Sequence, residues 1–240
     1  MNLAKSKSAL ITGASSGIGK ATALAFAKVG IDVALVSRSQ EKLAAVASAV
    51  QQTGVKVTAC PLDLADVEQV REQISAIAAD FKVDILVNSA GMGYTGNLSE
   101  TPLTDWQAVM NLNLTSVFQC ILGVLPTMRD RGTGTIINVA SIAGVQPFPS
   151  WGAYSASKAG LIALSKTLAA EERQNGIRVT TICPGAVDTE LWNSDTVKIK
   201  LERSAMLTPE SVAQSILHTV LLPQQAVIEE LTLMPNAGVL

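Results

Sequence analysis

Short runs of β-branched and apolar residues alternate along the chain with longer segments of helical period. Most of the short runs are almost continuously apolar, as strands are when helices cover both faces of their sheet. The predicted strands are Ser8–Ile11, Val33–Ser37, Val55–Cys60, Ile85–Asn88, Thr135–Val139, Arg178–Cys183 and Val227–Leu233. The predicted helices are Gly17–Lys28, Gln40–Gln52, Val67–Asp80, Thr104–Met128, Gly152–Gln174 and Pro209–Leu221. This alternation predicts an α/β fold, a doubly wound parallel sheet of about seven strands with helices on both faces.

The linkers between these elements are short, and no repeat or Pro/Gly/Ser-rich hinge divides the chain, so residues 1–240 are expected to form a single domain. Residues 186–207 stand apart, because they follow a Pro-Gly turn and mix Leu191 and Trp192 with many polar residues. We expect this segment to be a mobile substrate-binding lobe within that domain.

Composition and charge exclude several classes of protein. With 48% hydrophobic and 16% charged residues the chain is a core-rich globular protein rather than a disordered one. Its 18 Lys and Arg against 20 Asp and Glu give a net charge of −2, and the basic residues are scattered, so no nucleic-acid partner is expected. Cys60, Cys120 and Cys183 form no CxxC pair, which favours a reducing cytoplasm and predicts no metal site. No run of apolar residues approaches membrane-spanning length, so no membrane partner is expected.

A glycine-rich turn, Thr12-Gly13-Ala14-Ser15-Ser16-Gly17-Ile18-Gly19, lies between the first predicted strand and the first predicted helix. Glycines let a backbone approach a pyrophosphate closely, and a helix N-terminus offers it unpaired N–H groups. The alternative is a purely structural turn, but the strand before it and the helix after it favour a dinucleotide cradle.

The residues after the second strand bear on which nucleotide binds. An enzyme that uses NAD usually has an acid there, whereas this chain has Ser37 and Arg38. A guanidinium pairs bidentately with a ribose 2′-phosphate, which favours NADPH, unless Arg38 is only a solvated residue at a helix start. Asp63, after the third strand, is a candidate acceptor for the adenine amino group or, alternatively, a helix cap.

Tyr154 and Lys158 are four residues apart on one face of a predicted helix, so they can act on one centre. An ammonium beside a phenol stabilises the phenolate, which makes Tyr154 a usable proton donor. Ser141 follows the fifth strand at the edge where open α/β sheets bind ligands, and its hydroxyl is a candidate to orient a carbonyl. Asn113 stands inside a predicted helix, where asparagine is disfavoured, and predicts a local distortion that holds a water.

Together these residues resemble the short-chain dehydrogenase/reductase family in its single-domain form. TGASSGIG matches the family's TGxxxGxG, and Asn88-Ser89-Ala90-Gly91 matches its NNAG except at Ser89. Ser141, Tyr154 and Lys158 match its catalytic set, Asn113 the asparagine of its tetrad, and Pro184-Gly185 with Thr189 the turn that contacts the nicotinamide. The match runs from about Ala9 to Trp192. The C-terminus lacks the Gly-Gly ending common in β-ketoacyl-carrier-protein reductases, which argues against fatty-acid synthesis.

The resemblance implies a Rossmann-like fold and reversible hydride transfer between NADP(H) and a carbonyl or secondary alcohol substrate. It implies Tyr154 as general acid/base, Ser141 orienting the oxygen, Lys158 on the nicotinamide ribose and Asn113 supporting a water, in a homodimer or homotetramer. The expected cofactor-binding residues are Gly13, Ser15, Ser16, Gly17, Ile18, Gly19, Ser37, Arg38, Asp63, Leu64, Asn88, Ala90, Gly91, Tyr154, Lys158, Pro184, Gly185, Val187 and Thr189. The expected substrate wall is Ser141 with Met92, Val145, Phe148, Trp151, Leu191 and Trp192, whose apolar members are alternatively plain core residues.

Two other functions use the same fold. A non-catalytic NADP(H)-binding sensor would not need Tyr154 or Lys158, and both are present. An epimerase or dehydratase that acts on nucleotide sugars normally has a longer substrate domain and an acid after the second strand, and this chain has neither. The single histidine, His218, has no metal-ligand neighbour and is expected at the surface.

Overall fold

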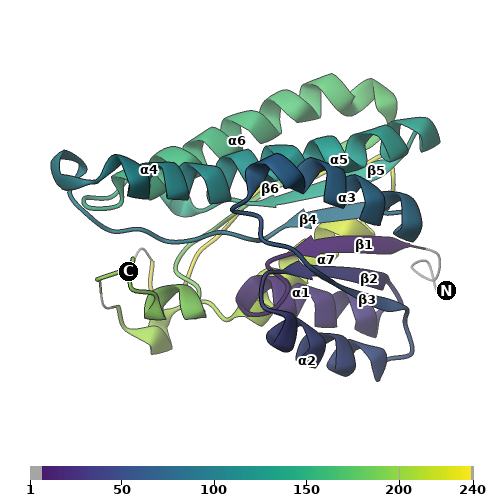
Figure 1. The fold of residues 1–240 in the computed structure, drawn as a ribbon, viewed down its shortest axis with the longest axis horizontal. Helices are drawn as coiled ribbons and strands as arrows, with labels where there is room; N and C mark the ends of the chain where they lie inside the picture. Colours follow the sequence, from purple (N-terminus) through teal and green to yellow (C-terminus); the bar gives the residue numbers. More distant parts are fainter. Residues whose placement is uncertain (1–6, 200, 239–240) are drawn as a thin grey trace.

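The computed structural model describes residues 7–199 and 201–238, which form one sheet between two layers of helices (Figure 1). Seven parallel strands pair in the order β3-β2-β1-β4-β5-β6-β7. They are β1 (Ser8–Thr12), β2 (Asp32–Ser37), β3 (Val57–Pro61), β4 (Ile85–Asn88), β5 (Gly134–Val139), β6 (Ile177–Pro184) and β7 (Glu230–Leu233). The predicted fold class, a seven-stranded doubly wound parallel sheet, is confirmed.

Helices cover both faces of this sheet (Figure 1). One layer holds α1 (Gly17–Lys28), α2 (Gln40–Gln51) and α7 (Pro209–Leu221), and the other holds α3 (Val67–Phe81), α4 (Leu103–Met110), α5 (Ser116–Arg131) and α6 (Gly152–Glu172). The strand order reverses at β1, which lies between β2 and β4. In open parallel sheets such a reversal opens a crevice at the carboxyl ends of the strands, where ligands bind.

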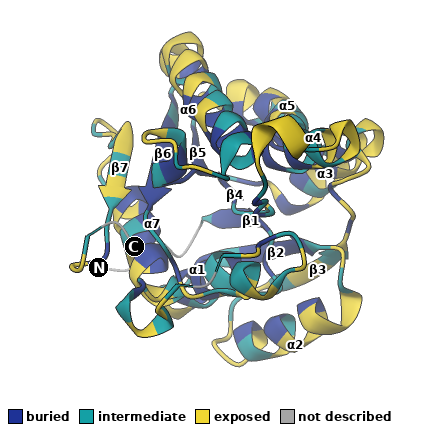
Figure 2. Cartoon of the chain, turned by 90° about the vertical axis from the view of Figure 1, so that its left-hand side faces the viewer, coloured by how far each residue is buried: buried dark blue, intermediate teal, exposed yellow. Residues whose placement is uncertain are grey.

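Two buried clusters hold the layers together, one on each face of the sheet, and Figure 2 shows the central strands buried while the edge strand β7 is largely exposed. Leu10 and Ile11 are neighbours in β1, yet Leu10 packs with Ile74 of α3 and Ile11 packs with Phe26 of α1. Successive strand residues point to opposite faces, so a continuously apolar strand serves both clusters. The apolar runs of the sequence therefore encode a sheet covered on both sides.

The main differences from the predicted elements concern β3, β7 and the long helix. β3 begins at Val57 rather than Val55 and β7 at Glu230 rather than Val227, because those are the first residues that pair with β2 and β6. The predicted helix Thr104–Met128 is α4 and α5 joined by a π-helical turn at Asn111–Thr115. That turn is the distortion predicted from Asn113.

The helical stretch Leu103–Arg131 is long and apolar enough to cross a membrane by length and composition alone. Its most apolar window of 18 residues has a mean hydropathy of 1.6, and half of that window is buried inside the fold. A core helix of a soluble protein passes the same test, so this one helix is weak evidence for a membrane span.

Candidate active site

One cavity of about 680 Å³ lies where the strands β1, β2, β4, β5 and β6 end. Its wall contains most of the residues predicted for cofactor, catalysis and substrate. The predicted residues that line it are Gly13, Ser15, Ser16, Gly17, Ile18, Ser37, Arg38, Asp63, Leu64, Ala90, Gly91, Met92, Ser141, Phe148, Trp151, Tyr154, Lys158, Pro184, Gly185, Val187, Thr189, Leu191 and Trp192. The sheet therefore brings together residues that are up to 180 positions apart in the chain.

The glycine turn after β1 is packed so tightly against the loop after β4 that a side chain at Gly13 is excluded. Gly13 has a φ of 65°, and a Cβ there would lie 2.8 Å from the backbone N of Ala90. The N-cap residue Ser16 makes no side-chain cap bond, and the first turn of α1 holds no acidic residue. The unpaired N–H groups and positive dipole end of α1 thus remain for an anion, so the turn fits a pyrophosphate.

Two hydroxyl groups hold this turn against neighbouring strands. Thr12 Oγ1 accepts hydrogen bonds from the backbone N–H groups of Ser89 (3.1 Å) and Ala90 (3.2 Å). The hydroxyls of Ser15 and Ser37 are 2.8 Å apart, which joins the turn to the end of β2. Thr12 was not predicted as a residue that positions the turn, although a polar residue at the end of an apolar strand could have indicated this role.

Two predicted cofactor residues, Gly19 and Asn88, are not among the residues that line the cavity, and their contact with the cofactor stays a prediction. A Cβ on Gly19 would clash with the carbonyl of Gly13, so this glycine serves the packing of α1 on the turn. Asn88 is buried, and its amide donates to Asn138 Oδ1 (2.9 Å), whose own amide donates to Ser165 Oγ (2.8 Å). Asn88 thus ties β4 to β5 and α6, because its side chain points into the sheet rather than into the cavity.

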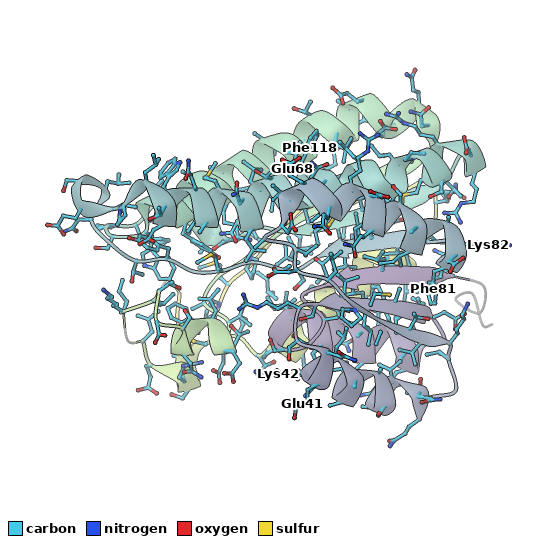
Figure 3. All side chains as sticks on the ribbon, viewed as in Figure 1. Glu41, Lys42, Glu68, Phe81, Lys82 and Phe118 are labelled. Carbon is cyan, nitrogen blue, oxygen red and sulfur yellow. The ribbon has the colours of Figure 1, made fainter. Side chains whose placement is uncertain are left out.

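Cations gather at the end of the cavity next to β2. Arg38 and Lys42 both line it and are exposed, and Figure 3 labels Lys42 in the first turn of α2. Lys42 was missed in the sequence, although it lies in the first turn of the helix that follows Arg38. Asp63 also lines this end, but one of its carboxylate oxygens accepts the backbone N–H of Ala65 (3.0 Å), a local turn bond.

Tyr154 and Lys158 lie together at the other end, on the first two turns of α6. Lys158 Nζ is 5.7 Å from the centre of the Tyr154 ring and donates to the carbonyl of Val139 (2.9 Å). Burial lowers the pKa of Lys158 to about 8 and raises the pKa of Tyr154, an effect that the Ser141 hydroxyl opposes. Tyr154 is therefore a protonated phenol at neutral pH, beside an ammonium group that titrates readily.

Asn113 lies behind these residues, in the π-helical turn, and does not line the cavity. Its side chain is fully buried, and Oδ1 accepts the backbone N–H of Met92 (2.8 Å). Its amide nitrogen donates to the carbonyl of Met92 (2.9 Å) and to Ser157 Oγ (3.1 Å). Both amide hydrogens are thus bonded to protein atoms, so the Asn113 side chain clamps the loop after β4 to α6.

Aromatic side chains form the wall near Tyr154. Trp151 contacts the Tyr154 ring edge to face (5.2 Å between centres) and the Trp192 ring likewise (5.8 Å). Val145 follows the turn Ile142–Gly144, is 52% exposed and does not line the cavity, so its contact with a substrate stays a prediction. Sequence patterns missed further wall residues, which come from scattered segments: Gly93, Ile142, Pro149, Ala186, Glu190, Ser194, Ile199, Leu201 and Met234.

The lobe of residues 186–207 contains two short 3-10 turns, Glu190–Asn193 and Arg203–Ala205. A group of hydrogen bonds, here called the strap, ties it to the loop after β4. Thr196 accepts at its carbonyl from the N–H of Thr95 (2.9 Å) and donates from its hydroxyl to the carbonyl of Gly93 (2.7 Å). The backbone N–H of Lys198 donates to Thr95 Oγ1 (2.8 Å). The mobility of the lobe stays a prediction.

Comparison with known proteins identifies the class to which this fold and site belong. The family model of the short chain dehydrogenases matches residues 7–199, and the chain belongs to this family of oxidoreductases. An uncharacterized oxidoreductase of Staphylococcus aureus is 33% identical over 98% of this chain and all of its own length. An alcohol dehydrogenase of Thermococcus sibiricus, solved with 5-hydroxy-NADP, is 31% identical over 96% of this chain and 97% of its own, with a TM-score of 0.87. A short-chain dehydrogenase of Sphingobium yanoikuyae, solved with NADPH, is 30% identical over 96% of this chain and 88% of its own, with a TM-score of 0.83.

Proposed function

We propose that this protein is an NADP(H)-dependent carbonyl reductase that interconverts a neutral carbonyl compound and its secondary alcohol. The observation that carries the proposal is that Tyr154, Lys158 and Ser141 line the same cavity as the uncapped N-terminus of α1 and the cation Arg38. The two solved relatives were crystallised with forms of NADP, which supports the choice of cofactor.

The residues of the chain divide the work between binding and proton transfer. Gly13, Ser16 and Gly17 would hold the pyrophosphate of the cofactor, and Arg38 its 2′-phosphate. When bound, NADPH supplies the hydride. Ser141 Oγ positions the carbonyl oxygen of the substrate, and the protonated Tyr154 Oη gives that oxygen its proton. The Lys158 ammonium, 5.7 Å from the centre of the ring, stabilises the phenolate that remains.

The wall around Tyr154 indicates what kind of carbonyl compound fits. Trp151 and Trp192 make it apolar, since the Trp151 ring contacts both the Tyr154 ring and the Trp192 ring. The cations Arg38 and Lys42 lie at the opposite end of the cavity, so among the described lining residues Lys158 is the cation beside Tyr154. A neutral, apolar ketone or aldehyde therefore suits the cavity better than a carboxylate or a phosphorylated sugar.

The proposal includes a homo-oligomer in the cytoplasm. Phe118 of α5 and Leu103 of α4 leave 43% and 69% of their surface exposed on the same helical layer, which supports self-association. All three cysteines are free, which agrees with a reducing compartment. Light scattering of the purified protein tests the assembly, and a monomer at micromolar concentration would contradict it.

The test of the reaction is Tyr154→Phe, assayed by loss of NADPH absorbance with a panel of neutral ketones. We expect turnover to fall by about 10²-fold or more while NADPH affinity changes little, because the ring stays and the proton is lost. Phe148→Tyr is the control, because it adds a hydroxyl to another aromatic residue of the cavity wall where Tyr154→Phe removes one. Full turnover by Tyr154→Phe would refute the role of Tyr154, and a wild type that binds NADPH but reduces nothing in the panel would favour a sensor.

A further inference from the structure

Ser157 lies on α6 between Tyr154 and Lys158, fully buried and away from the cavity. Its hydroxyl donates to the carbonyl of Tyr154 (2.7 Å), as helical serines often do toward the preceding turn. What is unusual is its second bond, because the same oxygen accepts a hydrogen from the Asn113 amide (3.1 Å). One serine thus connects the catalytic helix to the π-helical turn.

The Asn113 amide is also hydrogen-bonded to the cavity wall. Its two other bonds go to the backbone N–H (2.8 Å) and carbonyl (2.9 Å) of Met92, which lines the cavity. A Cβ placed on Gly91 would lie 3.2 Å from Asn113 Oδ1 and 3.5 Å from Lys158 Nζ, so both atoms flank the same point. The Asn113 amide and the Lys158 ammonium therefore both pack against Gly91, which precedes Met92 in the loop after β4.

We propose that Ser157 is a positioning residue for the reaction, which acts by fixing the Asn113 amide next to Lys158. Without the Ser157 oxygen, one Asn113 hydrogen would be left unpaired in a buried place, and the amide would have to turn or shift to satisfy it. The Asn113 amide would then shift against Gly91, which also faces the Lys158 ammonium, and the loop at Met92 would lose its fixed position. This inference rests on the proposed function of Tyr154 and Lys158.

The chain offers a matched control on the same helix. Ser165 is also buried, donates to the carbonyl of Leu161 (2.7 Å) and accepts from the amide of Asn138 (2.8 Å). Ser165→Ala therefore removes the same pair of bonds two turns further along α6, without touching Asn113 or Lys158. If the two variants lose the same free energy of unfolding, a loss of kcat that only Ser157→Ala shows is an effect on the reaction and not on folding.

The experiment measures kcat against pH and the KM of NADPH for wild type, Ser157→Ala and Ser165→Ala. We expect Ser157→Ala to lower kcat by up to about tenfold, the weight of one hydrogen bond, with the KM of NADPH within about twofold. The apparent pKa of the basic limb should move up, because a loosened loop at Gly91 and Met92 admits water to Lys158, whose pKa is lowered by burial. Ser165→Ala should keep both the kcat and the pH profile of the wild type.

A double variant shows whether Ser157 acts through Asn113. In an Asn113→Ala background, Ser157→Ala should cost no further kcat. If Ser157→Ala does not fold, Ser157→Cys fills the same space with a weaker hydrogen-bonding group and should show the same changes to a smaller degree. The proposal fails if the kcat and pH profile of the Ser157 variants match those of wild type or of Ser165→Ala, or if the loss persists without Asn113. A failure of the proposed function would appear separately, as full turnover by Tyr154→Phe.

Discussion

Arg38 and Lys42 place two cations at the adenosine end of the cavity, where Ser37 stands in place of an acid. A charge-assisted hydrogen bond to a phosphate contributes about 1.5–3 kcal/mol, so we expect a preference for NADPH over NADH of roughly ten- to a hundredfold. Arg38→Leu should remove most of that preference and Lys42→Met a smaller part, because lysine binds phosphate as a point charge. A Ser37→Asp/Arg38→Leu double variant should favour NADH.

The measurement for this prediction is the ratio of kcat/KM with NADPH to kcat/KM with NADH. Glu41→Gln is the matched control, since Glu41 is exposed on the first turn of α2 beside Lys42 but does not line the cavity (Figure 3). A wild type that uses both cofactors equally, or an unchanged ratio in Arg38→Leu, would show that these cations do not select the cofactor.

Single functional residues could be predicted where the chemistry requires a particular residue type shortly after the end of a strand. The hydroxyl of Ser141 and the pair of Tyr154 and Lys158 met in the cavity because each follows a short, recognisable element. Val145 was expected in the cavity wall but is exposed, because no sequence pattern records the direction of the side chain that follows a short turn. Met234 could not be found at all, since it reaches the cavity from the far end of the chain through the pairing of β7 with β6.

At the scale of elements, the strap between the lobe and the loop after β4 determines how firmly the cavity is covered. Thr95 and Thr196 hold it through two hydroxyl groups, and both side chains are at least partly buried. Thr95→Val and Thr196→Val keep the shape and remove these bonds, so we expect faster hydrogen exchange across residues 187–199 and a higher KM for the carbonyl substrate.

Ser204→Ala is the control for the strap, because Ser204 lies in the lobe and its hydroxyl bonds to the exposed Glu202. Exchange that is equally slow in wild type and both strap variants would show that the hydrogen bonds do not hold the lobe. The mixed composition of residues 186–207 after the Pro-Gly turn predicted a weakly packed segment at this place. It contained no sign of the partners at Gly93 and Thr95, which lie about a hundred residues earlier in the chain.

At the scale of the whole molecule, the apolar strand runs and intervening helical periods were sufficient to predict a covered parallel sheet. The order of the strands was beyond this reasoning, because hydrophobic period reports which faces are buried and not which strand is the neighbour. The π-helical turn was anticipated only as a distortion, since asparagine indicates a defect in a helix but not its geometry. The strand order and the geometry of the π-helical turn depend on contacts between elements that are distant in the sequence.

One such contact joins the C-terminal ends of α5 and α6. The carboxylate of Glu172, whose side chain is 1% exposed, accepts two hydrogen bonds from Arg129 and one from Asn175 (2.9 Å). Arg129→Met leaves this carboxylate buried with one partner, which costs about 3–5 kcal/mol for fully buried pairs. The Arg129 side chain is 52% exposed and solvent screens the pair, so we expect about 1–3 kcal/mol in the free energy of unfolding.

The dependence of this loss on pH identifies its cause. Hydrogen bonding from Arg129 lowers the pKa of Glu172 in the folded state, so the pair stabilises fully above the pKa of an unfolded glutamate, about 4.3, and its contribution fades as the pH falls through the lower folded value. Denaturant unfolding of wild type and Arg129→Met should therefore differ most near pH 6 and converge toward pH 3. Glu72→Gln, which changes an exposed glutamate of α3, should match wild type throughout. A gap between wild type and Arg129→Met that is the same at both pH values would assign the loss to the packing of the Arg129 methylenes rather than to its charge.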